Sequence, residues 1–202
     1  HVLGGKGFTA PSDKLNIAGV GVREWGRGSN NIHQSRNENI VALCDVDFNQ
    51  SKPTFDKYPK AKVYKDYRVM LDKQKDIDAV IVSTPDHNHA VITMKAIKMG
   101  KHVYCEKPLT HTVYEAREIT KAAKKYNVQT QMGNQGRSSD EIRKLKEWID
   151  DDAIGPVREL LAWTDRPIGG HAWDTFAVKA KSKEKPPIPE GLDWDLWLGP
   201  AQ

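Results

Sequence analysis

Residues 15–21 read LNIAGVG, an apolar strand that runs directly into the glycine pair Gly19 and Gly21. From here to residue 133, short apolar runs alternate with helical patterns, which is typical of a parallel sheet covered by helices. The expected strands are Leu15–Val20, Ile40–Val46, Lys62–Tyr64, Ala79–Thr84, His102–Cys105 and Val128–Met132. Several of them lack polar alternation, as expected of strands buried on both faces. The sequence therefore predicts an α/β fold built on a doubly wound parallel sheet.

Composition narrows the classes of protein to consider. The 202 residues include 31 basic and 27 acidic side chains, a net charge of +4. No run approaches the roughly 18 apolar residues of a membrane-spanning helix, so we expect no membrane partner. No basic stripe is interleaved with aromatic residues, so we expect no nucleic-acid partner. Cys44 and Cys105 lie inside apolar runs, at no spacing typical of zinc sites, and are interpreted as small buried hydrophobic residues.

The ends of several helices can be read from the sequence. One helix should stop at Gly100, because glycine commonly follows a helix C-terminus. Thr112 and Glu115 have the spacing of a capping box, and Ser138 with Glu141 repeats that spacing ahead of an apolar stripe. These signals predict helices that pack one apolar face against the sheet.

The character of the chain changes after residue 156. Val157–Thr164 is expected to form a new strand, and a stretch rich in Lys and Pro runs from 179 to 189, without further alternation of strand and helix. The predicted organisation is a tail over 1–14, a first domain over 15–135, and the beginning of a second domain over 136–202.

The glycine pair suits a phosphate-binding turn. One glycine allows a tight turn, and the other lets the backbone approach a pyrophosphate at a helix N-terminus. The third position of the usual G-x-G-x-x-G spacing is Glu24, and the next glycines, Gly26 and Gly28, come late. Either the loop is longer, or the helix packs less closely on the sheet. A simple turn is the alternative interpretation.

Asp45 closes the second expected strand, 26 residues after Gly19. A carboxylate there accepts hydrogen bonds from both ribose hydroxyls and repels a 2′-phosphate, which favours NAD over NADP. Asp47 is a less well placed alternative, and a solvated aspartate at a strand end is the non-functional interpretation.

Two further motifs follow strands, TPDHNH at 84–89 and EKP at 106–108. Open α/β sheets bind ligands at the carboxyl ends of their strands, where both motifs are expected. His87 and His89 suggest a metal site, but no third ligand at useful spacing supports one. Lys107, fixed in direction by the following proline, can hold a positive charge against a substrate hydroxyl, although a surface lysine in a turn is the ordinary interpretation.

In this order the motifs resemble the glucose–fructose oxidoreductase/inositol dehydrogenase (Gfo/Idh/MocA) superfamily, from about residue 14 to residue 157. Its most specific element is EKP, and the others are the Gly-x-Gly pair, ALCDVD at 42–47 and DAVIVSTP at 78–85. An exported bacterial branch is suggested by MGNQ at 132–135, WTDRP at 163–167 and LDWDLWLGP at 192–200.

The resemblance implies a Rossmann domain followed by an α/β domain with a mostly antiparallel sheet, whose open face shapes the substrate site and often an oligomer interface. It implies hydride transfer between nicotinamide C4 and a hydroxyl-bearing carbon of a sugar, polyol or related compound. Lys107 would contact the reacting hydroxyl and assist proton movement. Glu106 and a cis peptide to Pro108 would shape the nicotinamide end. The family's catalytic histidine has no match, because His171 comes too early, and it is expected beyond Gln202.

The residues expected to bind the cofactor are therefore Gly19, Gly21, Val22, Arg23, Asp45, Val46, Thr84, Pro85, His87, His89, Glu106, Lys107 and Asn134. Lys107, Trp163 and Arg166 are the substrate candidates. Trp163, Trp173, Trp194 and Trp197 could stack on a sugar ring, but packing is the favoured interpretation of clustered tryptophans.

The expected activity is that of an NAD(H)-dependent oxidoreductase of carbohydrate metabolism, acting as a homo-oligomer when full length. The alternatives are a glycosidase that recycles bound NAD and a non-catalytic NAD-binding sensor. His1 in place of Met indicates processing or trimming, and the stop just after an aromatic segment suggests a fragment. Because HVLGG at 1–5 resembles the segment after a twin-arginine signal, we expect export to the periplasm, with a cytoplasmic location as the alternative.

Overall fold

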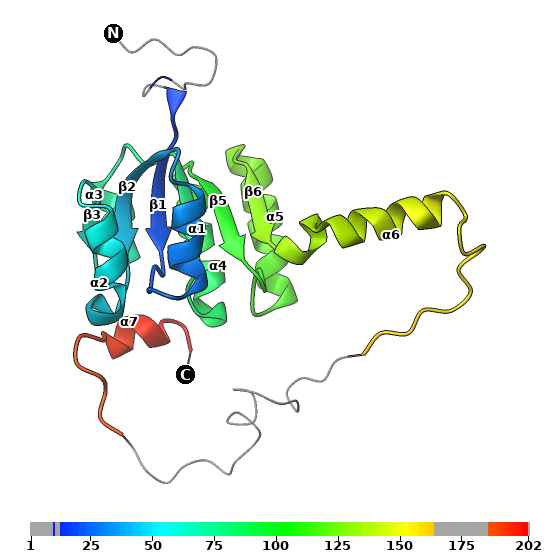
Figure 1. The fold of residues 1–202 in the computed structure, drawn as a ribbon. Coiled ribbons are helices and arrows are strands. Elements are labelled where there is room, and N and C mark those ends of the chain that lie inside the picture. The colour runs from blue at the N-terminus through cyan, green and yellow to red at the C-terminus, as the bar shows by residue number, and fades with distance from the viewer. Residues whose placement is uncertain (1–9, 11–12, 164–185, 202) are drawn as a thin grey trace. The chain divides into compact units, whose positions relative to one another are not determined.

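The computed structural model describes residues 10, 13–163 and 186–201. Within them, six parallel strands form one sheet in the order β3-β2-β1-β4-β5-β6 (Figure 1). This is the order of a doubly wound dinucleotide-binding fold, so the predicted fold class is confirmed. The strands are β1 (Asn16–Val20), β2 (Asn39–Cys44), β3 (Lys62–Tyr64), β4 (Ala79–Val82), β5 (His102–Glu106) and β6 (Thr130–Gly133).

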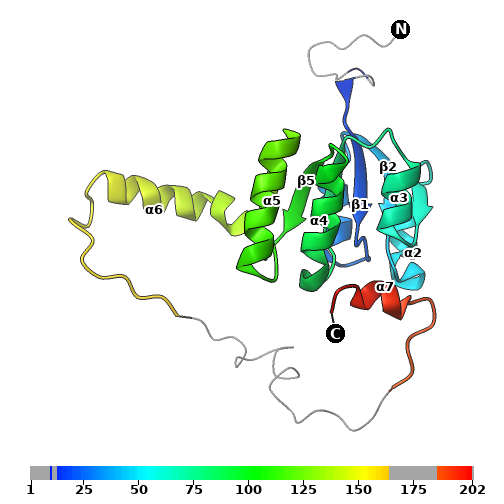
Figure 2. The same ribbon diagram turned by 180° about the vertical axis from the view of Figure 1, so that it is seen from behind.

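Helices cover both faces of this sheet. One face carries α1 (Arg27–Gln34) and α2 (Phe48–Lys57), seen in front in Figure 1. The other carries α3 (Tyr67–Lys73), α4 (His89–Lys98) and α5 (Val113–Tyr126), seen in front in Figure 2. The remaining elements are the 3-10 turns η2 (Asp86–Asn88) and η3 (Gln135–Ser138), and the helices α6 (Asp140–Asp150) and α7 (Trp194–Leu198).

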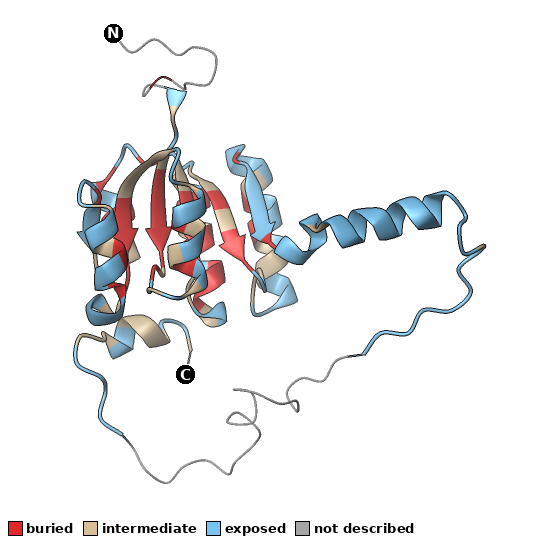
Figure 3. Cartoon of the chain, in the orientation of Figure 1, coloured by how far each residue is buried: buried red, intermediate tan, exposed pale blue. Residues whose placement is uncertain are grey.

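Alternate residues of β1, β2, β4 and β5 face opposite cores, which explains the unbroken apolar runs of these strands. Ala18 and Val80 belong to the cluster under α3, α4 and α5, whereas Ile17 and Ile81 belong to the cluster under α1 and α2. The central strands are correspondingly buried in Figure 3. Cys105 is buried with them, and burial raises the pKa of its thiol to about 11.

Two helix ends confirm the sequence signals. Thr112 and Glu115 form the complete capping box of α5, with the Glu115 amide donating to Thr112 Oγ1 and the Thr112 amide donating to Glu115 Oε2. Gly100 follows α4 with a positive φ of 73°. The third signal was misplaced by one residue. Ser139, not Ser138, caps α6 by accepting from the Ile142 amide, because the 3-10 turn η3 occupies residues up to 138.

The chain divides into two compact units, residues 1–134 with 189–202, and residues 135–188. The break near residue 135 agrees with the expected boundary, which stays a prediction. The expected second domain over 136–202 differs from this grouping, because the segment from residue 189 onward groups with the first unit. The expected strand at Val157–Thr164 is wrong over its described residues 157–163, which are exposed and irregular. A strand needs a hydrogen-bonded neighbour, and the described residues of this unit contain none.

In the second unit, α6 exposes the stripe Ile142, Leu145, Trp148 and Ile149 (Figure 3). No helix in the described parts of the chain is long and apolar enough to cross a membrane.

Candidate functional site

A cavity of about 540 Å³ lies at the carboxyl ends of β1, β2 and β4, where the strand order reverses around β1. Ligands of open α/β sheets bind at this point. The lining comes from segments that are far apart in the sequence: the glycine loop after β1, the ends of β2 and β4, residues 65–67, residues 88 and 92, and residues 189–197. The cavity is therefore the candidate ligand site of the first unit.

The glycine loop, residues 21–28, lines this cavity. Gly21 has a positive φ of 78°, and a Cβ there would lie 2.7 Å from the Ser83 carbonyl oxygen. A Cβ on Gly28, in the first turn of α1, would lie 1.7 Å from the carbonyl oxygen of Gly21. The loop is thus longer than the short form, and Gly28 supplies the close packing of helix on strand that the third glycine usually gives.

Glu24, which occupies the usual third position, has a different task. Its carboxylate accepts hydrogen bonds from Thr54 Oγ1 at 2.9 Å and Lys57 Nζ at 2.8 Å, both on α2. The hydrogen bond from Lys57 lowers the pKa of Glu24, and the bond from Thr54 adds to this effect. Glu24 therefore ties the long glycine loop to α2.

Asp45 is buried at the end of β2 rather than solvated. Its Oδ2 accepts from the Val22 amide at 2.7 Å, and its Oδ1 accepts from the Asp47 amide at 2.9 Å. Burial raises the pKa of Asp45, and the two backbone hydrogen bonds oppose that shift. The carboxylate is fixed against the glycine loop and lines the cavity. Asp47 instead caps α2 by accepting from the Gln50 amide at 3.0 Å.

Asn31 of α1 links the ends of β4 and β5. Its Nδ2 donates to Ser83 Oγ at 3.0 Å and to Glu106 Oε1 at 2.8 Å. Glu106 is buried, and Tyr104 also donates to its Oε1 at 3.3 Å. Lys107 follows and is exposed, and the Lys107–Pro108 peptide is cis, as expected. A rigid buried carboxylate therefore holds the backbone from which Lys107 extends.

His89 connects the turn after β4 with the turn after β5. The ring is buried, with Nδ1 2.6 Å from the Pro108 carbonyl oxygen and Nε2 2.9 Å from the Thr84 carbonyl oxygen. Both partners are acceptors, so the ring bridges the loop after β4 and the loop after β5. The structure places His89 in a supporting position, and among the described residues no group of three or more His, Cys, Asp or Glu could hold a metal ion.

The other predicted residues are distributed unevenly. Arg23, Val46, Thr84 and Pro85 line the cavity, together with Gly21 and Asp45. Val22 is buried in the core with its amide on Asp45, and Gly19 packs against Ile32. Asn134 is exposed beyond β6. Trp163 is exposed in the other unit, and Arg166, His171 and Trp173 lie outside the described residues.

Sequence reasoning missed three parts of the site. Asn31 gave no signal, because it is one polar residue on an ordinary polar helix face. Lys65, Asp66 and Tyr67, before and at the start of α3, also line the cavity. The aromatic segment 192–198 is the third part, because packing is the favoured interpretation of its tryptophans, yet its residues line the cavity. The flanking Gly191 and Gly199 could have marked it as a loop with two close contacts.

The cavity fits a dinucleotide by two observations. Gly21 and Gly28 line the cavity, and neither position can take a side chain, because a Cβ there would meet the backbone of Ser83 or of Gly21. Thr84 lines the cavity, and its Oγ1 is buried with no hydrogen-bond partner among the described residues. A bound ligand can provide that partner, since buried hydroxyls are rarely left unsatisfied.

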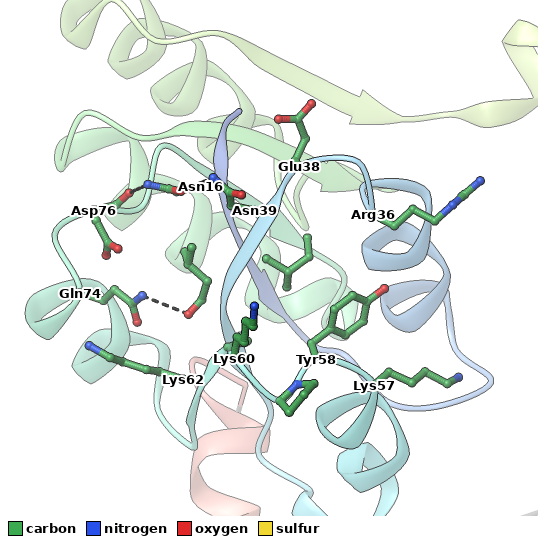
Figure 4. Close-up of a pocket in the computed structure, with 14 residues that line it drawn as sticks. Asn16, Arg36, Glu38, Asn39, Lys57, Tyr58, Lys60, Lys62, Gln74 and Asp76 are labelled. Carbon is green, nitrogen blue, oxygen red and sulfur yellow. Dashed lines mark hydrogen bonds between the residues drawn. The ribbon is translucent and has the colours of Figure 1, made fainter. Parts of the chain in front are cut away.

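A second hollow of about 600 Å³ lies at the opposite, amino-terminal ends of the strands (Figure 4). Gln74 closes part of it by donating from Nε2 to the Val41 carbonyl oxygen at 3.0 Å. Lys57, Lys60, Lys62 and Arg36 surround it. Since ligands of this fold bind at the carboxyl ends, the hollow in Figure 4 is not the dinucleotide site.

Known proteins resemble the chain in both sequence and fold. The model of the oxidoreductase family with an NAD-binding Rossmann fold matches residues 15–134. The D-glucoside 3-dehydrogenase of Escherichia coli (strain K12) is 30% identical over 186 residues, covering 90% of this chain and 52% of that protein. The inositol 2-dehydrogenase of Salmonella typhimurium (strain LT2) is 30% identical over 148 residues, covering 70% of this chain and 43% of that protein.

Solved structures also resemble this chain in fold and sequence. An inositol dehydrogenase homologue from Azotobacter vinelandii, complexed with NADH and myo-inositol, has a TM-score of 0.62 and 26% identity, covering 72% of this chain and 41% of its own. An NAD-binding protein from Listeria innocua has a TM-score of 0.63 and 27% identity, covering 70% of this chain and 42% of its own. The chain thus spans about half the length of the relatives it matches.

Proposed function

This chain belongs to the Gfo/Idh/MocA oxidoreductase family, and from that premise we propose that its crevice binds NAD(H) for hydride transfer to or from a hydroxyl-bearing carbon of a sugar, polyol or glycoside. The observation that carries the proposal is that Gly21, Gly28 and the Asp45 carboxylate, which the Val22 amide holds, line one cavity at the carboxyl ends of the strands. The dehydrogenases of glucosides and inositols among its relatives support the substrate class.

Different residues of the cavity would bind different parts of the dinucleotide. The backbone around Gly21 and the N-terminus of α1 would hold the pyrophosphate, because helix N-termini favour anions. Asp45 would accept from the ribose hydroxyls. Since backbone amides hold both of its oxygens, it cannot turn away from a 2′-phosphate, and this repulsion favours NAD over NADP.

Lys107 would act on the substrate side. When bound, NAD(H) supplies or accepts the hydride at its nicotinamide ring. The Lys107 ammonium would hold the reacting hydroxyl and stabilise the negative charge that develops on its oxygen as the hydride leaves. Glu106, anchored by Asn31, would keep the backbone before Lys107 in place. The second catalytic group, a histidine by the resemblance, stays a prediction.

Fluorescence titration of the full-length protein with NADH and NADPH tests the proposal. NADH should bind more tightly, and Asp45→Ala should reduce the difference between the two. Absence of binding to either dinucleotide would overturn the proposed function, and equal affinities would overturn the role of Asp45.

We also propose export to the periplasm and assembly as a homo-oligomer. The resemblance of residues 1–5 to the segment after a twin-arginine signal supports the first. The second is supported by family resemblance. Cell fractionation and light scattering of the full-length protein test them: cytoplasmic retention would refute export, and a monomer would refute assembly.

A further inference from the structure

Residues 189–199, here called the strap, are fixed to one edge of the crevice, the loop between β2 and α2. The Asp193 amide donates to the Val46 carbonyl oxygen at 2.9 Å, and Leu192 forms an antiparallel bridge with Asp47. Asn49 adds a third bond, from its Nδ2 to the Glu190 carbonyl oxygen at 2.8 Å. The strap therefore begins on the strand end that carries Asp45.

The other end of the strap is fixed to the opposite edge, the turn η2 after β4. The Trp197 carbonyl oxygen accepts from Asn88 Nδ2 at 2.9 Å and from His87 Nε2 at 2.8 Å. The His87 ring also contacts the Trp197 ring edge-on, with 5.2 Å between ring centroids. Hydrogen bonds thus hold the strap on both sides of the cavity, and α7 lies across the carboxyl ends of the strands in Figure 1.

Each end of the strap requires a glycine. Gly191 has a φ of 89°, and a Cβ there would lie 2.6 Å from Asn49 Nδ2. Gly199 has a φ of 51°, and a Cβ there would lie 2.1 Å from Asn88 Oδ1. Any other residue would have to adopt an unfavourable backbone conformation and also push the anchoring asparagine away. The strap therefore packs tightly on the protein at both ends, against Asn49 and against Asn88.

The underside of the strap is apolar and lines the cavity. Leu192, Leu196 and Trp197 face the same space as the glycine loop and Asp45. Trp194 stacks on Trp197 with 4.9 Å between centroids and 8° between planes, which gives the strap a rigid face. A planar, mostly apolar group bound between Asp45 and the β4 end would be covered by this face, and an adenine ring has that chemistry.

We infer that the strap forms part of the dinucleotide site, enclosing the adenosine half, so that NAD(H) is released only when the strap detaches. This rests on the proposed function, because it assigns an adenine nucleotide to the cavity. It goes beyond that function in making the cofactor one that exchanges slowly, because a segment about 150 residues downstream of the end of β2 covers it.

The dissociation rate of NADH from the full-length protein tests the inference, measured by stopped-flow displacement with excess NAD⁺. Gly199→Ala should accelerate release by about tenfold or more, because the new methyl group displaces Asn88 and strains the backbone. Asn88→Ala, which removes one donor to Trp197, should accelerate it by about fivefold. The matched control is Gly100→Ala, which also has a positive φ but nothing within 4 Å, and should release NADH at the wild-type rate.

The outcomes separate the two proposals. If both Gly199→Ala and Asn88→Ala release NADH at the wild-type rate, or if Gly100→Ala accelerates release equally, the proposed role of the strap is overturned. If Gly199→Ala fails to fold, Asn88→Ala alone decides. Failure of the wild-type protein to bind NADH at all would overturn the proposed function instead.

Discussion

Among glycine-to-alanine substitutions in the site, Gly28→Ala should reduce folding stability and NADH binding the most. Its Cβ would lie 1.7 Å from the Gly21 carbonyl oxygen, less than half of an ordinary contact distance, and the obstacle is backbone. Either α1 or the glycine loop must move by more than an ångström. Such overpacking typically costs about 1–3 kcal/mol of folding free energy, and the cradle would lose its shape. We expect loss of measurable NADH binding together with a lowered unfolding midpoint.

Three other glycines give a graded series for the same assay. A Cβ on Gly19 would meet the flexible end of Ile32 at 2.6 Å, and one on Gly26 would meet the Arg23 carbonyl oxygen at 3.0 Å. Gly136 has nothing within 4 Å and serves as the control. Urea unfolding and NADH titration of the four alanine variants should rank Gly28 as the most damaged and Gly136 as unaffected. A Gly28→Ala protein that unfolds and binds NADH like the Gly136→Ala control would refute the close approach.

Three further predictions concern charged and capping groups. Lys107→Met should lower turnover of the full-length protein by at least about 10²-fold while leaving NADH affinity within a few-fold, and normal turnover in steady-state assays would remove it from catalysis. Because burial raises the pKa of Asp45, the folded chain holds that proton more tightly than the unfolded chain, so its contribution to stability falls as pH rises through the raised pKa. Asp45→Asn should flatten that part of the profile in urea unfolding from about pH 3 to pH 8, and an unchanged slope would contradict it. Thr112→Ala should cost about 1 kcal/mol of unfolding free energy, because it removes the capping box of α5, and thermal unfolding within error of wild type would argue against that cap.

The sheet could be predicted closely because its inner strands β2, β1, β4 and β5 are buried on both faces and turn residues bound the strands. Lys62–Tyr64 was predicted with its bounds, and the other strands differ by one or two residues at their ends. The site followed from the sheet, since Asp45, Thr84 and Glu106 lie at or just beyond the carboxyl ends of parallel strands. The departure at Glu24 left two interpretations open, and only the distance from Gly28 to Gly21 decided between them.

Contacts between distant segments could not be predicted in this way. The position of the strap depends on hydrogen bonds from Asn49, His87 and Asn88, and local sequence gives no indication of partners more than a hundred residues away. His89 was expected to face the cofactor because it follows a strand, but its two carbonyl partners come from separate loops. The exposed segment 157–163 has strand-like composition but no pairing partner among the described residues.

Native mass spectrometry of the full-length protein with equimolar NADH and NADPH tests the central claim most directly, run alongside Gly28→Ala and Gly136→Ala. The account predicts a one-to-one adduct with the mass of NADH on the wild-type protein and on Gly136→Ala, little NADPH adduct, and no adduct on Gly28→Ala. A wild-type protein without a dinucleotide adduct, or a Gly28→Ala variant that carries as much NADH as the wild type, would contradict it.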